Sequence, residues 1–117
     1  MNKGSTIFTS PSVLEEKFIS IWQQNYPQIK LAREYRFHPK RQFRFDFAHP
    51  LTSIGIECQG GIWGGKMGHN SGSGISRDCE KICLAASMGW LAFPLTEQMI
   101  NPQYLKMIAK TILNRRI

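Results

Sequence analysis

Two acidic residues in this chain have the type and spacing to hold a cation between them. Asp46 lies in "QFRFDFAHP" and Glu57 in "SIGIECQG", two segments whose residues alternate in polarity. Their positions are nearly symmetric about the turn "HPLTS", so in an antiparallel hairpin they should lie opposite each other or on a diagonal. Two carboxylates at one spot repel each other unless a cation or proton intervenes. Because Mg²⁺ prefers oxygen ligands, the pair predicts a magnesium site, where Gln59 could orient a bound water.

The same carboxylates have an ordinary structural alternative. Asp46 can pair with Arg44 or Arg41, and Glu57 can pair with Lys81. The composition favours the metal interpretation. Fifteen Lys and Arg stand against eight acids, and the resulting net charge of +7 indicates an anionic partner such as a phosphate backbone. Acids that hold a metal within basic surroundings are what phosphodiester hydrolysis requires.

A glycine-rich stretch, "IECQGGIWGGKMGHNSGSG" (56–74), follows the second carboxylate. Its frame Gly60-x-x-x-x-Gly65-Lys66 approaches a nucleotide P-loop, but Met67 stands where Ser or Thr must hold magnesium, and we expect no helix in "GHNSGSG". We therefore expect the loop to approach nucleic-acid phosphates through glycine amides, with Trp63 or His69 stacking on bases. The predicted nucleic-acid contacts are Arg41, Arg44, Lys66, His69 and Arg77.

Hydrophobic periodicity predicts the elements that must position these residues. A helix begins at the cap Ser12 and ends near Pro27, with the apolar stripe Leu14, Phe18, Ile21 and Trp22. A strand in "IKLAREYRFHPK" follows, and then the hairpin. Phe43, Phe45 and Phe47 should face one side of its first strand, and Ile54, Ile56 and Cys58 one side of its second.

The second half of the chain predicts a helix, a short strand and a last helix. The helix "SRDCEKICLAASMG" is capped by Ser76, ends at Gly89, and buries the stripe Ile75, Cys79, Ile82, Cys83 and Ala86. "WLAFPL" is a buried strand, and "NPQYLKMIAKTILNRRI" is a helix capped by Asn101. The order helix, three strands, helix, strand, helix predicts a single α/β domain over residues 1–117.

The three cysteines lie in apolar patterns, which favours reduced, buried thiols. A zinc site from His69, Cys79 and Cys83 is the alternative, but core cysteines are the better interpretation because Cys79 and Cys83 share the apolar stripe. There is neither an apolar run long enough to span a bilayer nor a signal peptide in "MNKGSTIFTSPS", so we expect a cytoplasmic protein.

An Asp ending one strand, Glu-x-Gln on the next, and this element order together resemble the PD-(D/E)XK nuclease superfamily. Residues 12–100 carry the resemblance, most strongly 44–90, where Gly-Gly follows Glu-x-Gln and "RDCEK" opens a helix. This part is similar to small phage- and mobile-element endonucleases of the homing and short-patch-repair types. The resemblance implies a restriction-endonuclease-like αβββαβ fold with a mixed sheet. It also implies a Mg²⁺-dependent DNA endonuclease, in which Mn²⁺ substitutes, acting on double-stranded DNA in a bacterial or phage-infected cell. Because one small domain has little surface for recognising a long site, we expect a homodimer or higher oligomer, which would double the footprint and supply one cut per strand.

The resemblance also assigns roles to single residues. Asp46 and Glu57 are the implied metal ligands, together with the carbonyl of Cys58. Gln59 stands where the superfamily usually has Lys, and Lys81 on the following helix is its implied replacement. Glu15 supplies a further carboxylate.

Two residues keep more than one interpretation. Glu15, Asp46, His69 and Asp78 occur in the order of a catalytic set in the mismatch-repair-like branch. His69 can activate water or protonate the leaving oxygen, or it can simply contact phosphate. Asp78 can equally be an acid in the first turn of its helix.

The rival functions are a Holliday-junction-type resolvase and a non-catalytic nucleic-acid-binding domain. The basic residues of the last helix (Lys106, Lys110, Arg115 and Arg116) either contact DNA or are solvated.

Overall fold

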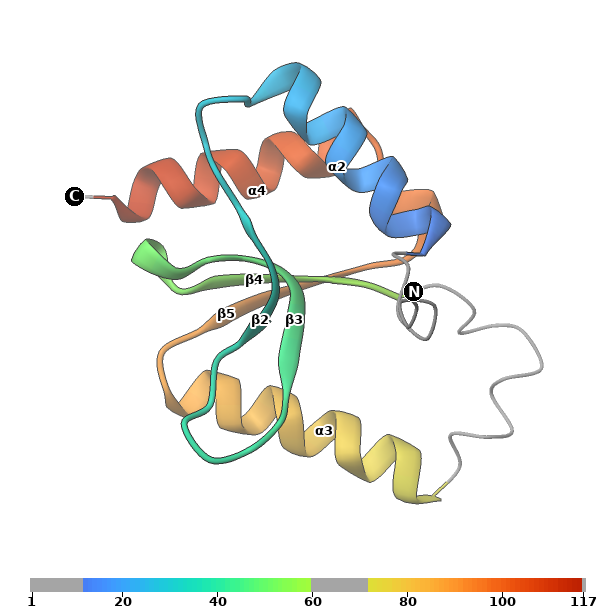
Figure 1. Cartoon of the computed structure of the whole chain (residues 1–117), viewed down its shortest axis with the longest axis vertical. Coiled ribbons are helices and arrows are strands. Elements are labelled where there is room, and N and C mark those ends of the chain that lie inside the picture. Colours follow the sequence, from blue (N-terminus) through green and yellow to red (C-terminus); the bar gives the residue numbers. More distant parts are fainter. Residues whose placement is uncertain (1–11, 60–71, 117) are drawn as a thin grey trace, which may run out of the picture.

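The computed structural model describes residues 12–59 and 72–116, and it is an α/β structure built on a four-stranded mixed sheet (Figure 1). Along the chain the elements are α2 (Val13–Asn25), β2 (Ala32–Arg36), β3 (Arg44–His49), the 3₁₀ turn η1 (Pro50–Thr52), β4 (Ile54–Cys58), α3 (Gly72–Ser87), β5 (Leu91–Leu95), the 3₁₀ turn η3 (Glu97–Met99) and α4 (Pro102–Arg115). This is the predicted order of helix, three strands, helix, strand, helix.

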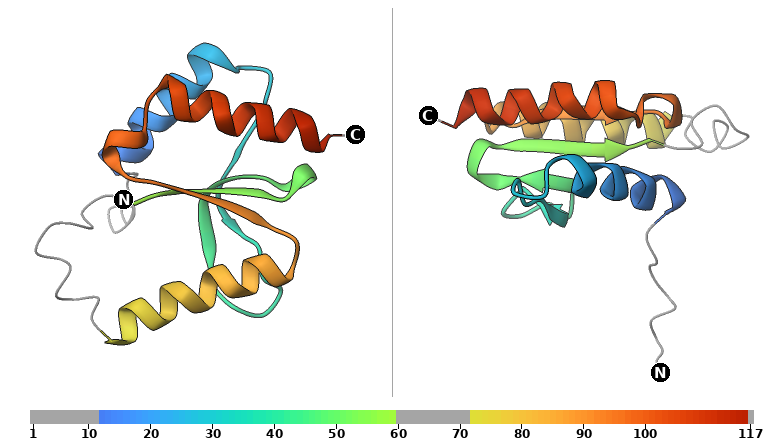
Figure 2. Two further views of the ribbon diagram at one scale, coloured as in Figure 1. Left: turned by 180° about the vertical axis from the view of Figure 1, so that it is seen from behind. Right: turned by 90° about the horizontal axis from the view of Figure 1, so that it is seen from above.

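The strands lie side by side in the order β2-β3-β4-β5. β3 pairs antiparallel with both β2 and β4, so the predicted hairpin is confirmed, while β4 and β5 are parallel and joined through α3. Helices α2 and α4 cover one face of the sheet and α3 covers the other (Figure 2). Within the described residues, no helix has the length and apolar character needed to cross a membrane.

Local capping explains where two of the helices begin. Ser12 Oγ accepts a hydrogen bond from Glu15 N at 3.0 Å, and Asn101 Oδ1 accepts one from Tyr104 N at 3.2 Å, so both predicted N-caps are confirmed. The predicted start of α3 is wrong, because that helix begins at Gly72 and Ser76 lies inside it. A glycine costs a helix only about 1 kcal/mol relative to alanine, so a short glycine-containing turn can extend a helix that is stabilised further along.

The larger apolar core lies between the sheet and the helices α2 and α4. Phe18 and Trp22, the centre of the predicted α2 stripe, stack on each other at 5.6 Å between ring centroids, and Phe18 stacks on Phe47 at 4.8 Å. The indole N–H of Trp22 donates to the carbonyl of Ile29 at 2.9 Å, which satisfies the one polar group in this layer of rings.

The alternation expected for β3 is wrong, because its phenylalanines do not share one side. Phe47 packs into the α2/α4 core, whereas Phe43 and Phe45 pack with Ala85 of α3 on the opposite face. The change of face occurs at Asp46. Its neighbour on β2, Glu34, has a left-handed backbone (φ 49°) and is skipped between the register pairs Arg33↔Phe47 and Tyr35↔Phe45. This local irregularity lets successive phenylalanines enter different cores.

The stripe predicted to bury α3 is exposed, and the prediction of core cysteines is therefore wrong for Cys79 and Cys83. Helix α3 instead rests on the sheet through Leu84 and Ala85 and through charged side chains directed at β3 and β4. With Lys81 paired with Glu57 and Glu80 paired with Arg41, the predicted apolar stripe of α3 faces away from the sheet. Cys58 is partly buried and packs beside the α2/α4 core, as expected.

The close approach of β4 to Phe45 depends on Gly55. A Cβ atom on Gly55 would lie 2.5 Å from Phe45 Cδ2, much closer than a methyl group can approach a ring. We expect Gly55→Ala to lower the free energy of unfolding by about 1–3 kcal/mol through overpacking, measured by urea denaturation. In a Phe45→Leu background the same substitution should cost less, because the smaller side chain leaves space. Equal costs in both backgrounds would contradict this packing.

Candidate functional site

Asp46 lies where strands β3 and β4 separate. Their paired residues end at Phe47↔Ile56, and the same register continued by one residue would place Asp46 opposite Glu57. Beyond this pair, the amide N–H of Cys58 on β4 donates to a side chain of β3 instead of a backbone carbonyl. Its acceptor is Asp46 Oδ2, at 2.7 Å. The next amide, that of Gln59, donates to the carbonyl of Leu95 on β5 at 2.7 Å. The carboxylate is thereby held at the end of the sheet.

Glu57 forms an ion pair with Lys81, which reaches it from α3. Both side chains are largely buried, and the Lys81 ammonium also lies 5.3 Å from the centroid of the Phe45 ring. The pairing of Glu57 with Lys81 is the one that the structural alternative predicted. Lys81 is also the residue expected to replace the strand lysine of the superfamily, and the pair places it beside Glu57, a predicted metal ligand.

Two further carboxylates lie near Asp46, one from helix α2 and one from the neighbouring strand β2. Oxygen atoms of Glu15 on α2, Glu34 on β2 and Asp46 lie within 4.8 Å of one another. Glu15 was predicted to be near the site. Glu34 was not, although pairing the first two predicted strands would have placed it beside Asp46. Arg33, also absent from the predictions, bonds Glu16 at 3.2 Å and approaches Glu15 at 3.9 Å.

Burial, followed by repulsion from neighbouring acids, raises carboxyl pKa values at this end of the sheet. Burial is the main cause for Glu57, whose pKa rises to about 7, because desolvation and the nearby acids Asp46 and Asp78 outweigh the attraction of Lys81. Burial, followed by repulsion from Asp46 and Glu34, raises the pKa of Glu15 to about 6, against a smaller lowering by Arg33. The thiol pKa of Cys58 rises to about 12, again mainly through burial, so this cysteine is a neutral neighbour of the site.

The carboxylate oxygens of this cluster are donors of the type that a hard divalent cation takes. Mg²⁺ binds oxygen ligands at about 2.0–2.1 Å, so oxygens on opposite sides of the ion lie about 4 Å apart. The oxygens of Glu15, Glu34 and Asp46 lie within 4.8 Å of one another, so the side chains would have to draw slightly closer around an ion, which would offset their mutual repulsion. Asp46 is common to this cluster and to the predicted pair with Glu57.

The other predicted site residues fall into three groups. Gln59 is partly buried at the end of β4 and contributes its backbone to the sheet. Arg41 bonds Glu80 of α3 at 2.6 Å, and Arg44 lies 3.7 Å from Glu34, so neither makes the ion pair with Asp46 that the structural alternative required. The remaining predicted residues are Trp63, Lys66 and His69, which lie outside the described residues. His69 was also the third ligand of the zinc alternative.

Basic side chains from α3 and from the loop before β3 gather around Phe43. The guanidinium carbons of Arg41 and Arg77 lie 4.8 and 5.1 Å from its ring centroid. Asp78 is exposed in the second turn of α3, because the helix begins at Gly72, so a first-turn role is excluded. Positive charge therefore flanks the carboxylates on the α3 side, next to the Glu57–Lys81 pair.

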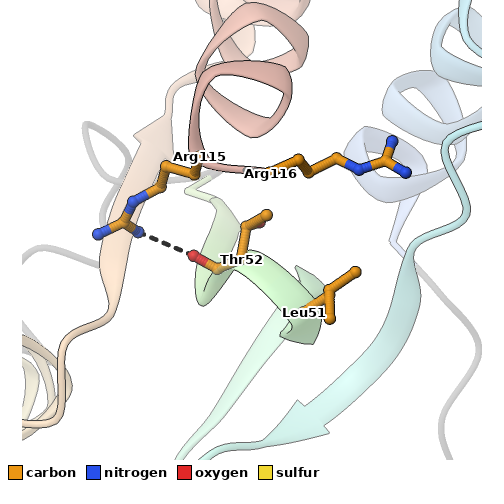
Figure 3. A pocket seen from close by; sticks show the side chains of 4 residues that line it. All are labelled: Leu51, Thr52, Arg115 and Arg116. Atoms are coloured by element: carbon orange, nitrogen blue, oxygen red, sulfur yellow. Dashed lines mark hydrogen bonds between the residues drawn. The ribbon is translucent and has the colours of Figure 1, made fainter.

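A surface pocket of about 300 Å³ lies far from these acids, at the start of β4 instead of its end (Figure 3). It is lined by Leu51, Thr52, Arg115 and Arg116. Arg115 Nη1 donates to the carbonyl oxygens of Thr52 and Ser53 at 2.9 and 3.3 Å, so one base of the last helix serves to hold α4 on the hairpin turn. The pocket brings no acid together and is separate from the candidate site.

The raised pKa of Glu15 predicts a pH-dependent gain in stability when its charge is removed. A carboxyl with a folded-state pKa above its unfolded value contributes stability at low pH that is lost as pH rises through the folded value. Glu15→Gln should therefore become more stable relative to the wild type as pH rises from about 4.5 to about 7. Thermal unfolding in EDTA measures this, with Glu16→Gln, one residue along, as the matched control. A difference that does not change with pH would contradict the electrostatic origin.

Comparison of the chain with protein-family models, curated proteins and solved structures finds no match. Four separate elements, α2, β2, β3 and β4, contribute a carboxylate to one end of the sheet, and α3 contributes a lysine.

Proposed function

We propose that this protein is a metal-dependent DNA endonuclease with a restriction-endonuclease-like fold. One observation carries the proposal. Asp46, where strands β3 and β4 separate, lies within 4.8 Å of a carboxylate from the first helix, Glu15, and Glu57 on β4 pairs with a lysine from the following helix, Lys81. The PD-(D/E)XK resemblance implies these four residues, and the αβββαβ order of the elements agrees with it.

Each described residue has a distinct part in the proposed chemistry. A divalent cation bound at the carboxylates lowers the pKa of a coordinated water and offsets charge on the phosphate. Glu15, Glu34 and Asp46 would hold that ion, Asp46 being oriented for this by the Cys58 amide. The resemblance adds Glu57, which pairs with Lys81, to these ligands. Lys81 compensates the buried charge of Glu57 and supplies a cation beside the reacting phosphate. Arg41, Arg44 and Arg77 are proposed to bind the DNA backbone.

A non-catalytic nucleic-acid-binding domain remains the second candidate, and the Glu57–Lys81 ion pair is the observation that favours it. A pair of this kind can be purely structural, and a basic chain would bind nucleic acid without any metal. The two functions differ in the effect of neutralising Asp46. A nuclease would then lose cleavage but keep DNA binding, whereas a binding domain has no cleavage to lose. A Holliday-junction-type resolvase would have the same site and differ in the shape of its substrate.

The decisive experiment is cleavage of supercoiled plasmid with Mg²⁺, Mn²⁺ or EDTA, by the wild type and by Asp46→Asn. Asparagine is preferable to alanine because its Oδ1 can still accept the Cys58 amide hydrogen bond, so the sheet end stays intact. We expect metal-dependent nicking or linearisation by the wild type and a loss of at least about 100-fold in Asp46→Asn. Glu97→Gln, an exposed acid in η3, is the matched control and should cut normally.

Binding measured on the same variants separates the two candidates. Asp46→Asn should bind duplex and four-way-junction DNA at least as well as the wild type, because a repelling charge has been removed. If a panel of linear duplex, junction and single-stranded substrates is bound but never cut with either metal, the non-catalytic domain is the better account. If none of them is bound, both proposals are wrong.

The basic residues over Phe43 predict a sequence-independent contact. Arg77→Gln should weaken binding by a similar factor for unrelated DNA sequences and reduce the slope of log K against log salt by about 1, as loss of one phosphate contact does. Fluorescence anisotropy at several salt concentrations measures this slope. Lys30→Gln, an exposed base before β2, is the control, and an equal loss in it would show that only net charge matters.

A further inference from the structure

The connection between β2 and β3, residues 37–43, is here called the β2–β3 loop. With the residue on either side it reads "RFHPKRQFR", which contains four Lys or Arg residues and no acid. Strand β3 begins directly after it, so Phe43, its last residue, is about 10 Å along the strand from the candidate metal ligand Asp46. The loop lies against α3 (Figure 1), where Arg41 pairs with Glu80. A basic segment thus leads directly into the candidate site.

Buried aromatic rings fix both ends of the β2–β3 loop. Phe37 and Phe43 are each only 6% exposed, and the ring of Phe37 stacks on that of Phe45 with 4.8 Å between their centroids. The ion pair between Arg41 and Glu80 ties the second half of the loop to α3. These contacts hold the loop in one position relative to α3 and to the start of β3.

Hydrogen bonds within the loop define the turn at its tip. His38 Nδ1 accepts from the amide N–H groups of Lys40 at 3.1 Å and Arg41 at 3.0 Å. Arg36 Nε donates to the carbonyl of Arg41 at 2.9 Å, across the base of the loop. A side chain that accepts nearby amides in this way stabilises a turn as an Asn or Asp side chain does. The backbone that presents Lys40 is therefore fixed before any ligand binds, which lowers the entropic cost of binding.

Two of the bases in this segment have no acid beside them. Within residues 12–59 and 72–116, the exposed side chains of Arg36 and Lys40 form no ion pair. Arg41 and Arg44, by contrast, each have an acid within ion-pairing distance. Arg36 uses one N–H of its guanidinium group on the loop backbone, and the other N–H groups of this fork are left for a ligand. Neither Arg36 nor Lys40 was among the predicted nucleic-acid contacts.

We propose that the β2–β3 loop binds the DNA backbone beside the scissile phosphate, with Arg36 and Lys40 as the contacts and His38 as the residue that positions Lys40. The inference rests on the proposed function, which supplies the substrate and the place of cleavage. Phosphates follow each strand of duplex DNA every 3.4 Å or so along its axis, so a loop about 10 Å from Asp46 meets those about three nucleotides from the cut. Because the rings of the loop are buried, it contacts phosphates without reading bases.

Fluorescence anisotropy with a labelled duplex of arbitrary sequence, in EDTA and at several salt concentrations, tests the contact. Lys40→Gln should weaken binding by about 3- to 10-fold and reduce the slope of log K against log salt by about 0.9, as the loss of one phosphate contact does. Lys30→Gln removes the same charge before β2, at the end of that strand away from the loop, and should have a clearly smaller effect.

Two substitutions of His38 separate positioning from direct contact. The Oδ1 atom of asparagine can accept the same two amides, whereas alanine offers no acceptor. His38→Asn should therefore bind DNA nearly as the wild type does, and His38→Ala should bind about 3- to 5-fold more weakly. Equal weakening in both variants would show that the imidazole itself touches DNA, and it would overturn the positioning role.

Acetylation of the wild-type lysines by an N-hydroxysuccinimide ester, read by mass spectrometry, is a second measurement that needs no variant. Bound duplex should protect Lys40 and leave Lys30 reactive. If Lys40 reacts equally with and without bound DNA, or if Lys40→Gln binds as Lys30→Gln does, the loop contact is wrong while the nuclease proposal stands. A wild type that neither binds nor cuts DNA would instead overturn the proposed function, and this inference with it.

Discussion

The hydrogen bond from the Cys58 amide to the Asp46 carboxylate is the interaction on which the candidate site depends. Strands β3 and β4 stop pairing after Phe47 and Ile56, so the amide of Cys58, two residues further along β4, needs another acceptor. A buried amide left without one costs about 1–3 kcal/mol. Asp46 supplies the acceptor from its side chain, which fixes a carboxylate at the point where the strands separate. Glu57 is one residue earlier on β4, at the position that the register of the two strands, continued by one residue, places opposite Asp46.

The orientation of α3 is the second consequence of gathering acids at this end. Hydrophobic periodicity alone would turn Ile75, Cys79 and Ile82 toward the sheet. The structure instead directs Lys81 toward Glu57, whose buried carboxylate charge needs compensation, and pairs the exposed Glu80 with Arg41. Leu84 and Ala85 provide enough apolar contact to hold the helix in that orientation. A site rich in charge thus determines which face of a neighbouring helix is left in solvent.

The sequence was sufficient to predict the order of the elements, two helix caps and the hairpin. These follow from local periodicity, from turn residues and from symmetric placement about one short turn. Three features were beyond it. The place of Glu34 beside Asp46 depends on the pairing of β2 with β3 and on the left-handed backbone of Glu34 itself. The separation of Phe45 from Phe47 required the same irregularity. The orientation of α3 depended on ion pairs over 24 or more positions, which no local pattern contains.

The energetics of the acids favour a site over ordinary ion pairs. Burial and mutual repulsion raise the pKa values of Glu15 and Glu57, so at neutral pH their ionised forms weaken the metal-free fold. Arg33 and Lys81 lower this cost only in part. Residues selected for stability alone would be better placed in solvent or replaced by amides. A divalent cation would reverse the sign of the same interactions, because oxygens that repel one another in its absence become ligands in its presence. Under the proposed function, cation binding would therefore relieve a repulsion that is concentrated where Glu15, Glu34 and Asp46 meet.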